Sequence, residues 1–146
     1  MAQDKPEIIE RTYQETQEWL HEIAGNLERP DDLHAAYHAL RSVLHTLRDN
    51  LVPDEALDLS SQLPVLIRGI YFEGYRLSGR PVTHRTVDSF LDAVRTQLNT
   101  EAPEDLDPER CSRAVFGTLS GHLDAGQVRQ ARDMLHKDVQ GLWSAG

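Results

Sequence analysis

The stretch from Leu51 to Tyr75 carries the longest apolar helical stripe in the chain, and this stripe most constrains the fold. With a step of about 100° per residue in an α-helix, four apolar side chains fall within roughly 40° of Leu63. They are Ala56, Leu59, Ile67 and Ile70. Such a face is typical of a helix packed against a core. It predicts an all-α architecture and carries no information about chemistry.

Helical periodicity also appears elsewhere in the chain, and no segment shows the alternation of a β-strand. The other predicted helices cover Glu7–Leu27, Asp32–Leu51, Val87–Leu98, Pro108–Leu123 and Asp124–Leu142. Asp32, Asp107 and Asp124 are predicted N-caps. Pro64 lies inside the third helix, where proline removes a backbone hydrogen bond, so we expect a kink or a break near residues 60–63. The segment RLSGRPVT, residues 76–83, is predicted to be a linker.

The chain matches itself at a shift of 72 residues, which aligns residues 36–71 with 108–143. The identical pairs are Arg41 and Arg113, Val43 and Val115, Thr46 and Thr118, Leu47 and Leu119, Leu51 and Leu123, Leu63 and Leu135, and Gly69 and Gly141. A shift of 71 lays the first predicted helix on the fourth. The alternative is that amphipathic helices match because leucine recurs in all of them.

The repeated glycines favour the duplication, because glycine in a helix is unfavourable by roughly 1 kcal/mol and a recurring one suggests a close helix crossing in both halves. We therefore predict a single domain, residues 1–146, that is a six-helix bundle. It consists of two tandem pseudo-symmetric three-helix repeats, about 7–75 and about 84–146, joined by the linker.

Two runs carry a family resemblance: VLHTLRDNLVPDEALDLSSQLP, residues 43–64, and QLPVLIRGIYFEGY, residues 62–75. With the two-fold helical repeat, they resemble the bacterial family called domain of unknown function 2267. The resemblance covers nearly the whole chain, and its QLP, RG and EGY elements are fairly specific. It implies a small all-helical bacterial protein, and it implies no activity, substrate or catalytic residue.

Composition limits the partners. Asp and Glu number 24 against 15 Lys and Arg, for a net charge of -9, which argues against nucleic acid and anionic lipid as partners. The single cysteine cannot form an internal disulfide, which favours a reducing compartment such as the cytoplasm. No apolar run approaches the roughly 20 residues that span a bilayer, and no signal peptide is recognisable, so we expect a soluble cytoplasmic protein.

The second predicted helix carries a stripe of basic and imidazole side chains on the side away from its apolar face. The stripe consists of His34, His38, Arg41, His45 and Arg48. Two histidines four residues apart can bind a metal, but the arginines would repel a cation. We interpret the stripe as a solvated face, with a docking surface for an acidic partner as the functional alternative, and we predict no metal site.

The end of the third predicted helix is apolar on two sides, because Phe72 points away from the Leu63 face. The residues concerned are Arg68, Tyr71, Phe72, Glu73 and Tyr75. One interpretation is that the second half of the molecule covers these aromatic side chains. The other is that they line a groove for a partner helix or a small ligand.

No motif points to catalysis. The sequence has no Gly-rich phosphate loop, no G-x-S-x-G and no paired metal motif, and Cys111 has no obvious activating base nearby. We predict no catalytic residue and no cofactor. The leading hypothesis is a non-catalytic binding or adaptor module that takes an unknown protein partner or associates with itself. The alternative is a small-ligand or metal-binding protein, or an enzyme, that uses the groove between the two repeats.

Overall fold

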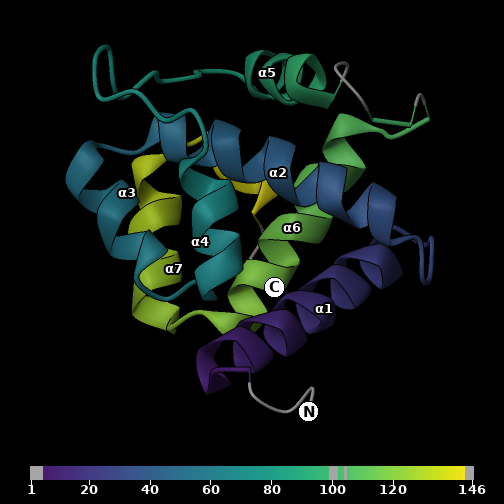
Figure 1. Ribbon diagram of the computed structural model, residues 1–146. Coiled ribbons are helices and arrows are strands. Elements are labelled where there is room, and N and C mark those ends of the chain that lie inside the picture. The colour runs from purple at the N-terminus through teal and green to yellow at the C-terminus, as the bar shows by residue number, and fades with distance from the viewer. Residues whose placement is uncertain (1–4, 99–101, 104, 144–146) are drawn as a thin grey trace.

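The computed structural model describes residues 5–98, 102–103 and 105–143, and within these ranges its regular elements are all helices, with no strand (Figure 1). The elements are α1 (Glu7–Asn26), α2 (Leu33–Asn50), α3 (Pro53–Ser60), α4 (Val65–Phe72), α5 (Val87–Leu98), α6 (Pro108–His122), α7 (Ala125–Met134) and a 3-10 turn, η2 (Gln140–Leu142). The all-α prediction is confirmed. No helix in the described ranges has both the length and the apolar character required to cross a bilayer.

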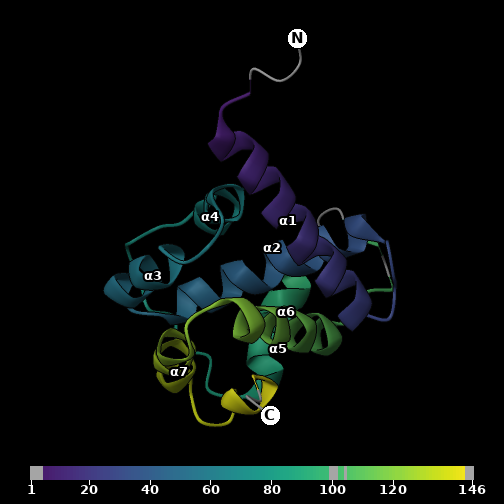
Figure 2. The same ribbon diagram turned by 90° about the horizontal axis from the view of Figure 1, so that it is seen from below.

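Helix α2 lies at the centre of the molecule and packs against α1, α4, α5 and α6 (Figures 1 and 2). Twelve of its 18 residues are buried. Leu40, Leu44 and Leu47 of α2 form the core with side chains from other segments. These include Phe90, Phe116 and Trp143. A helix covered on so many sides also buries polar side chains, and these need partners inside the protein.

The helix starts follow the local sequence. Asp32 accepts a hydrogen bond from Ala35 N, and Asp107 accepts one from Arg110 N. Asp124 accepts bonds from the backbone N–H groups that open α7. The three aspartates predicted as N-caps therefore serve as such, because each supplies an acceptor to N–H groups that have no partner within the helix.

The third predicted helix is two helices, since α3 ends at Ser60 and α4 begins after Pro64. Pro64 has an extended backbone and precedes the first residue of α4, so its missing N–H removes no helical bond. The expected break near residues 60–63 is confirmed. The last predicted helix also divides: α7 ends at Met134, and the Gln140 side chain of η2 donates to Leu135 O at 2.9 Å.

The expected close helix crossing at the repeated glycines is wrong. A Cβ added at Gly69 or at Gly141 would meet no other atom within 4 Å. Both residues are exposed, so each glycine lies on a solvent side of its segment. The shift that aligns the two glycines in the sequence does not say which side of each segment packs.

The segment between α4 and α5, which contains the predicted linker, crosses the carboxyl end of α2 and is bonded to it. Val82 N donates to Asp49 O at 2.7 Å, and Arg80 Nε donates to Asp49 Oδ1 at 3.1 Å. His84 N donates to Asn50 Oδ1 at 2.9 Å. The linker is thus a strap fixed by backbone and side-chain hydrogen bonds.

Candidate functional site

The polar stripe of α2 is not the solvated face that the sequence predicts. His45 is 2% exposed and Arg48 is 4% exposed, whereas His34 is exposed and His38 and Arg41 are half-buried. His45 and Arg48 are buried because α4 and the strap pack over this side of α2. Two of the five side chains are therefore inside the protein.

His45 and Arg48 bind the carbonyl end of α4. His45 Nε2 lies 2.7 Å from Ile70 O, and because a carbonyl only accepts, this nitrogen carries the proton. Arg48 Nη1 donates to Tyr71 O at 2.6 Å and to Glu73 O at 2.7 Å. The last carbonyls of a helix lack intrahelical donors and carry partial negative charge, so these bonds satisfy them and fix α4 on α2. We call His45 and Arg48 the carbonyl latch.

The aromatic residues predicted at the end of α4 surround this latch. The Arg48 guanidinium lies 5.4 Å from the centre of the Tyr75 ring. The Phe72 ring lies between Tyr71 and Tyr75, with centroids 4.9 Å and 6.0 Å away. Phe72 is partly buried, and the main neighbours of its helix are α1 and α2, so the first half of the chain covers it rather than the second.

Most of the predicted site residues therefore come together, but their polar groups are used internally. Arg41 Nε donates to Glu73 Oε1 at 3.0 Å. Tyr71 is fully buried and its hydroxyl donates to Ala56 O at 2.8 Å. Burial raises the pKa of Tyr71 far above its usual range and lowers the pKa of His45, where the nearby arginines act in the same direction. The polar groups of these residues thus bond to other parts of the fold.

Arg68 and His38 lie apart from this cluster. Arg68 Nε donates to Ser60 O at 2.9 Å and Arg68 Nη2 donates to Leu63 O at 3.0 Å, so this arginine caps the carbonyl end of α3. The His38 ring contacts Tyr37 edge-on, with centroids 5.3 Å apart. Neither residue joins the aromatic cluster that the sequence suggested.

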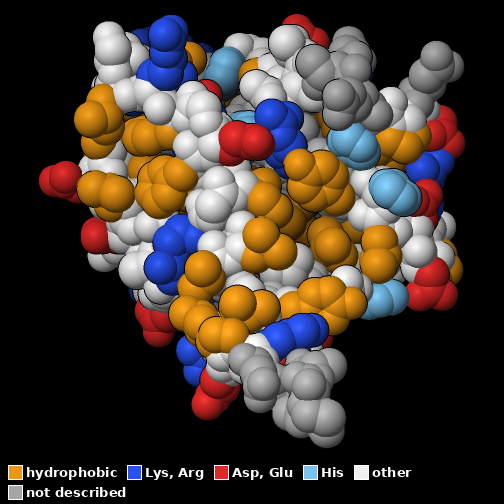
Figure 3. Space-filling view, in the orientation of Figure 1, with side chains coloured by type: hydrophobic (Ala, Val, Ile, Leu, Met, Phe, Trp, Pro, Cys, Tyr) orange, Lys and Arg blue, Asp and Glu red, His pale blue; other side chains and the backbone are white. Residues whose placement is uncertain are grey.

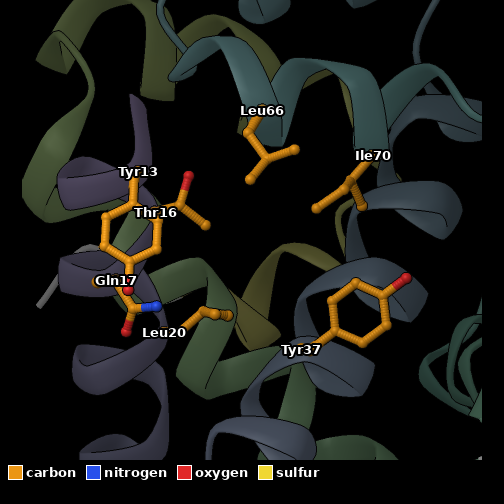
Figure 4. Close-up of a pocket in the computed structure, with 7 residues that line it drawn as sticks. All are labelled: Tyr13, Thr16, Gln17, Leu20, Tyr37, Leu66 and Ile70. Atoms are coloured by element: carbon orange, nitrogen blue, oxygen red, sulfur yellow. The ribbon is translucent and has the colours of Figure 1, made fainter. Parts of the chain in front are cut away.

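An apolar groove lies between α1, α2 and α4, next to the latch. Its volume is about 390 Å³. The lining residues are Tyr13, Thr16, Gln17 and Leu20 from α1, Tyr37 from α2, and Leu66 and Ile70 from α4. Figure 4 shows them facing a common hollow, with Leu66 and Ile70 along one side and the α1 residues along the other. Sequence reasoning missed this groove because it assigned Tyr13, Leu20 and Ile70 to core-facing stripes.

Apolar surface continues beyond the groove. Tyr13 is 59% exposed and Leu66 is 48% exposed, and Ile8, Ile9 and Val65 are also exposed. Hydrophobic side chains gather over α1 and α4 in the lower half of the face seen in Figure 3. The N-terminal end of α1 reaches past α4 at the edge of the molecule (Figure 2). An apolar patch of this kind on a folded chain is typical of an interaction site.

The two walls of the groove are held by bonds at both ends. Leu66 N, in the first turn of α4, donates to Thr12 Oγ1 of α1 at 2.9 Å. At the other end of α4 the carbonyl latch binds Ile70 O. At the floor, the hydroxyl of Thr16 is buried and has no hydrogen-bond partner. The groove is therefore preformed, and its floor carries one buried hydroxyl among apolar side chains.

A second hollow, of about 320 Å³, lies where the end of α1 meets α6 and is lined by Asn26, Glu28, Arg110, Arg113 and Ala114. It is a polar seam between α1 and α6. Arg110 pairs with Glu28 at 2.8 Å, and Arg113 pairs with Glu109 at 3.0 Å. Each arginine of this hollow therefore has a carboxylate partner, in a pair that is about half exposed or more.

Metal-ligating and nucleophilic side chains are dispersed. In the part of the chain that the structure describes, no three His, Cys, Asp or Glu residues are grouped as metal ligands would be. Cys111 is buried, and burial raises the pKa of its thiol to about 12. A thiol in that environment is held in its protonated, unreactive form.

Comparison with known proteins gives a family match. A family model described as "Uncharacterized conserved protein (DUF2267)" matches residues 16–142, which include α2, α4 and the second half of α1. The search of curated proteins gives no match.

Proposed function

The chain belongs to the DUF2267 family of uncharacterized conserved proteins, and from this premise we propose that it is a non-catalytic binding module that holds an apolar helix of a protein partner. The groove between α1, α2 and α4 is the docking site. The observation that carries the proposal is a preformed apolar groove whose rim residues Tyr13 and Leu66 remain about half exposed. Helices in other proteins dock in such grooves through apolar side chains at i, i+3, i+4 and i+7.

The energetics favour an occupant that covers the rim. Full burial of a side chain such as leucine contributes roughly 1.5–3 kcal/mol, so covering the exposed half of Leu66 or Tyr13 contributes roughly 1 kcal/mol each. The exposed neighbours Ile9 and Val65 extend this surface along both helices. Because the apolar surface is longer than the hollow itself, a helix covers more of it than a compact molecule does.

A small apolar ligand is the second candidate, since pockets for such ligands have volumes of about 300–1,000 Å³ and this groove lies in that range. From the sequence, we expect such a ligand between the two repeats. We place it instead in the groove between α1, α2 and α4, because the arginines of the seam between α1 and α6 are ion-paired. Competition by a medium-chain alcohol against the peptide described next tests it. Displacement at concentrations that leave the fold intact favours the small ligand.

The test uses a labelled amphipathic peptide of about 18 residues, roughly 27 Å as a helix, with leucines on one face and glutamines on the other. We expect fluorescence anisotropy to report binding, and Leu66→Asp to weaken it about tenfold or more. Leu57→Asp is the matched control, because Leu57 is 55% exposed on α3, away from the groove. Equal loss in both variants, or no binding to the unmodified protein, refutes the proposal.

We also propose that the fold is a duplication related by a pseudo-two-fold axis. In a two-fold arrangement, equivalent residues near the axis touch each other. Gln127 Nε2 donates to Glu55 Oε2, and these residues are 72 positions apart; α2 packs on its counterpart α6, and α3 on α7. A crystal structure tests it: residues 36–71 should superpose on 108–143 by a rotation near 180°, and a very different rotation contradicts the duplication.

Location and excluded partners follow from composition. We propose a bacterial cytoplasmic protein that binds neither nucleic acid nor membrane, supported by the single cysteine and the net charge of -9. Cell fractionation and a flotation assay with anionic vesicles test these points. Recovery with the membrane fraction, or flotation with vesicles, argues against them.

A further inference from the structure

The carbonyl latch connects a buried histidine to the groove. Ile70 belongs to both, because its carbonyl oxygen lies 2.7 Å from His45 Nε2 and its side chain lines the groove. We infer that the latch is a pH-sensitive device, in which protonation of His45 loosens α4 and weakens the binding of the docked helix. This inference rests on the proposed function, because it concerns the regulation of the same groove.

The position of His45 favours the neutral imidazole. The side chain is buried, because α4 packs over this side of α2. Its Nε2 already carries a proton, which it donates to Ile70 O, so a second proton would have to bind Nδ1 and would place a full positive charge inside the protein. A buried charge is unfavourable unless a partner of opposite charge faces it.

The charges at this joint between α2 and the end of α4 also oppose a second proton. The side chains there that can carry charge are Arg41, Arg48, Asp49, Tyr71, Glu73 and Tyr75. The phenols are uncharged near neutral pH, and Asp49 is bound by Arg48 and by Arg80 of the strap. Burial lowers the pKa of His45, and Arg48 and Arg41 act in the same direction. The bond to Ile70 O and the Glu73 carboxylate, which Arg41 binds at 3.0 Å, raise the pKa without reversing the shift.

A protonated His45 regains water only if α4 moves away from α2, because the end of α4 covers the ring. Arg48 binds the two carbonyls that lie beyond Ile70, so it still anchors the end of α4 when the bond to Ile70 is lost. The bond to Thr12 at the start of α4 is also kept. Acid should therefore loosen the groove wall at Ile70 without releasing α4 completely.

The lining of the groove does not itself titrate near neutral pH. It includes no histidine and no carboxylate, and its ionisable side chains are Tyr13 and Tyr37. The peptide of leucine and glutamine described above, with both termini blocked, also carries no titrating group. A change in its affinity between pH 7.5 and pH 5.5 must therefore come from a part of the protein outside the lining.

The experiment measures the binding of this peptide to the full chain by fluorescence anisotropy at pH 7.5 and pH 5.5. We expect the affinity to be about three- to tenfold weaker at pH 5.5, since a difference of about one unit in the pKa of His45 between the closed and the loosened latch changes it by up to about tenfold. His45→Gln keeps an amide donor for Ile70 O and cannot be protonated, so its affinity should change by less than about twofold. His34→Gln, at an exposed position of α2, is the matched control and should keep the full effect. Equal pH effects in His45→Gln and in the unmodified protein overturn the inference.

A second variant and a structural readout make the test independent of the folding of His45→Gln. Arg41→Gln removes one of the cations beside the ring, so the pH effect on binding should become smaller without vanishing. Hydrogen exchange in α4, measured relative to α6 in the same sample, should become faster in the unmodified protein when the pH falls from 7.5 to 5.5. An unchanged or larger pH effect in Arg41→Gln, or no relative increase in the exchange of α4, overturns the inference.

The outcomes for this inference and for the proposed function are distinct. If the peptide binds equally well at both pH values and Leu66→Asp weakens its binding, the groove is a docking site without pH control, and the inference alone is wrong. If the peptide binds at neither pH, both are wrong. If the unmodified protein loses its helical circular dichroism signal at pH 5.5, it unfolds as a whole, and this also overturns the inference.

Discussion

Replacing Thr16 by valine should stabilise the protein. Thr16 lies in the middle of α1 and is buried, and its hydroxyl has no hydrogen-bond partner. Valine has nearly the same shape and the same β-branching, so helix propensity and packing change little. Burying an unpaired hydroxyl costs about 1–3 kcal/mol in proteins. We therefore expect Thr16→Val to raise the free energy of unfolding by about 1–2 kcal/mol.

The assay is urea unfolding followed by circular dichroism, with the melting temperature as a second readout. For a chain of this length we expect an increase of about 2–8 °C. Thr46→Val is the matched control, because Thr46 is also buried but its Oγ1 donates to Ser42 O at 2.9 Å. Losing that bond should lower stability by about 0.5–1.5 kcal/mol. If Thr16→Val is as destabilising as the control, the hydroxyl has a partner and the reasoning is wrong.

Four further predictions concern other described features. Arg48→Met should lower the free energy of unfolding by about 2–4 kcal/mol, since it removes the donor to the carbonyl of buried Tyr71 and to that of Glu73, which follows α4. Arg110→Met, on the surface, should change it by less than about 0.5 kcal/mol in the same urea titration. The lowered pKa of His45 means that the unfolded chain binds its proton first, so the contribution of His45 to stability is complete above its usual pKa of 6.5 and is lost as pH falls below it. Unfolding midpoints at pH 7.5 and 5.5 should differ less in His45→Gln than in the unmodified protein, and an unchanged difference contradicts this. Cys111 should not react with a thiol reagent at pH 8 until the protein unfolds, and rapid labelling of the native state would show that its thiol is accessible. Gly69→Ala should stabilise the protein by about 0.5–1 kcal/mol, because an added Cβ meets open space, and a loss of stability would indicate the close crossing that the sequence suggested.

Features decided by local chemistry could be predicted from the sequence. The aspartates at 32, 107 and 124 cap helices because a short side-chain oxygen reaches N–H groups two or three residues ahead. Pro64 separates two helices because its ring removes the backbone N–H and clashes with a preceding helical turn. In both cases the partners lie within a few residues, so the helical pattern and the residue type are sufficient.

Features decided by which segments meet in space could not be predicted in the same way. A helical wheel places His45 and Arg48 away from the leucines of α2, which predicts exposure only if nothing covers that side. Tyr13 lies on the apolar side of α1, yet it is 59% exposed because none of the described helices covers it. The groove lies where no described helix covers the apolar side of α1. The helical pattern of the sequence does not reveal which part of an apolar face stays uncovered.

The two fastenings of α4, to Thr12 at its start and to the latch at its end, bear on the kinetics and entropy of recognition. Since hydrogen bonds hold α4 at both ends, we expect the ordering entropy lost on binding to fall mainly on the incoming segment. Association should then be a single concentration-dependent step, without a slow phase set by the protein. Peptides stapled into a helix beforehand should bind more tightly, with a higher association rate constant and a lower dissociation rate constant, and the conformation of the protein should not change.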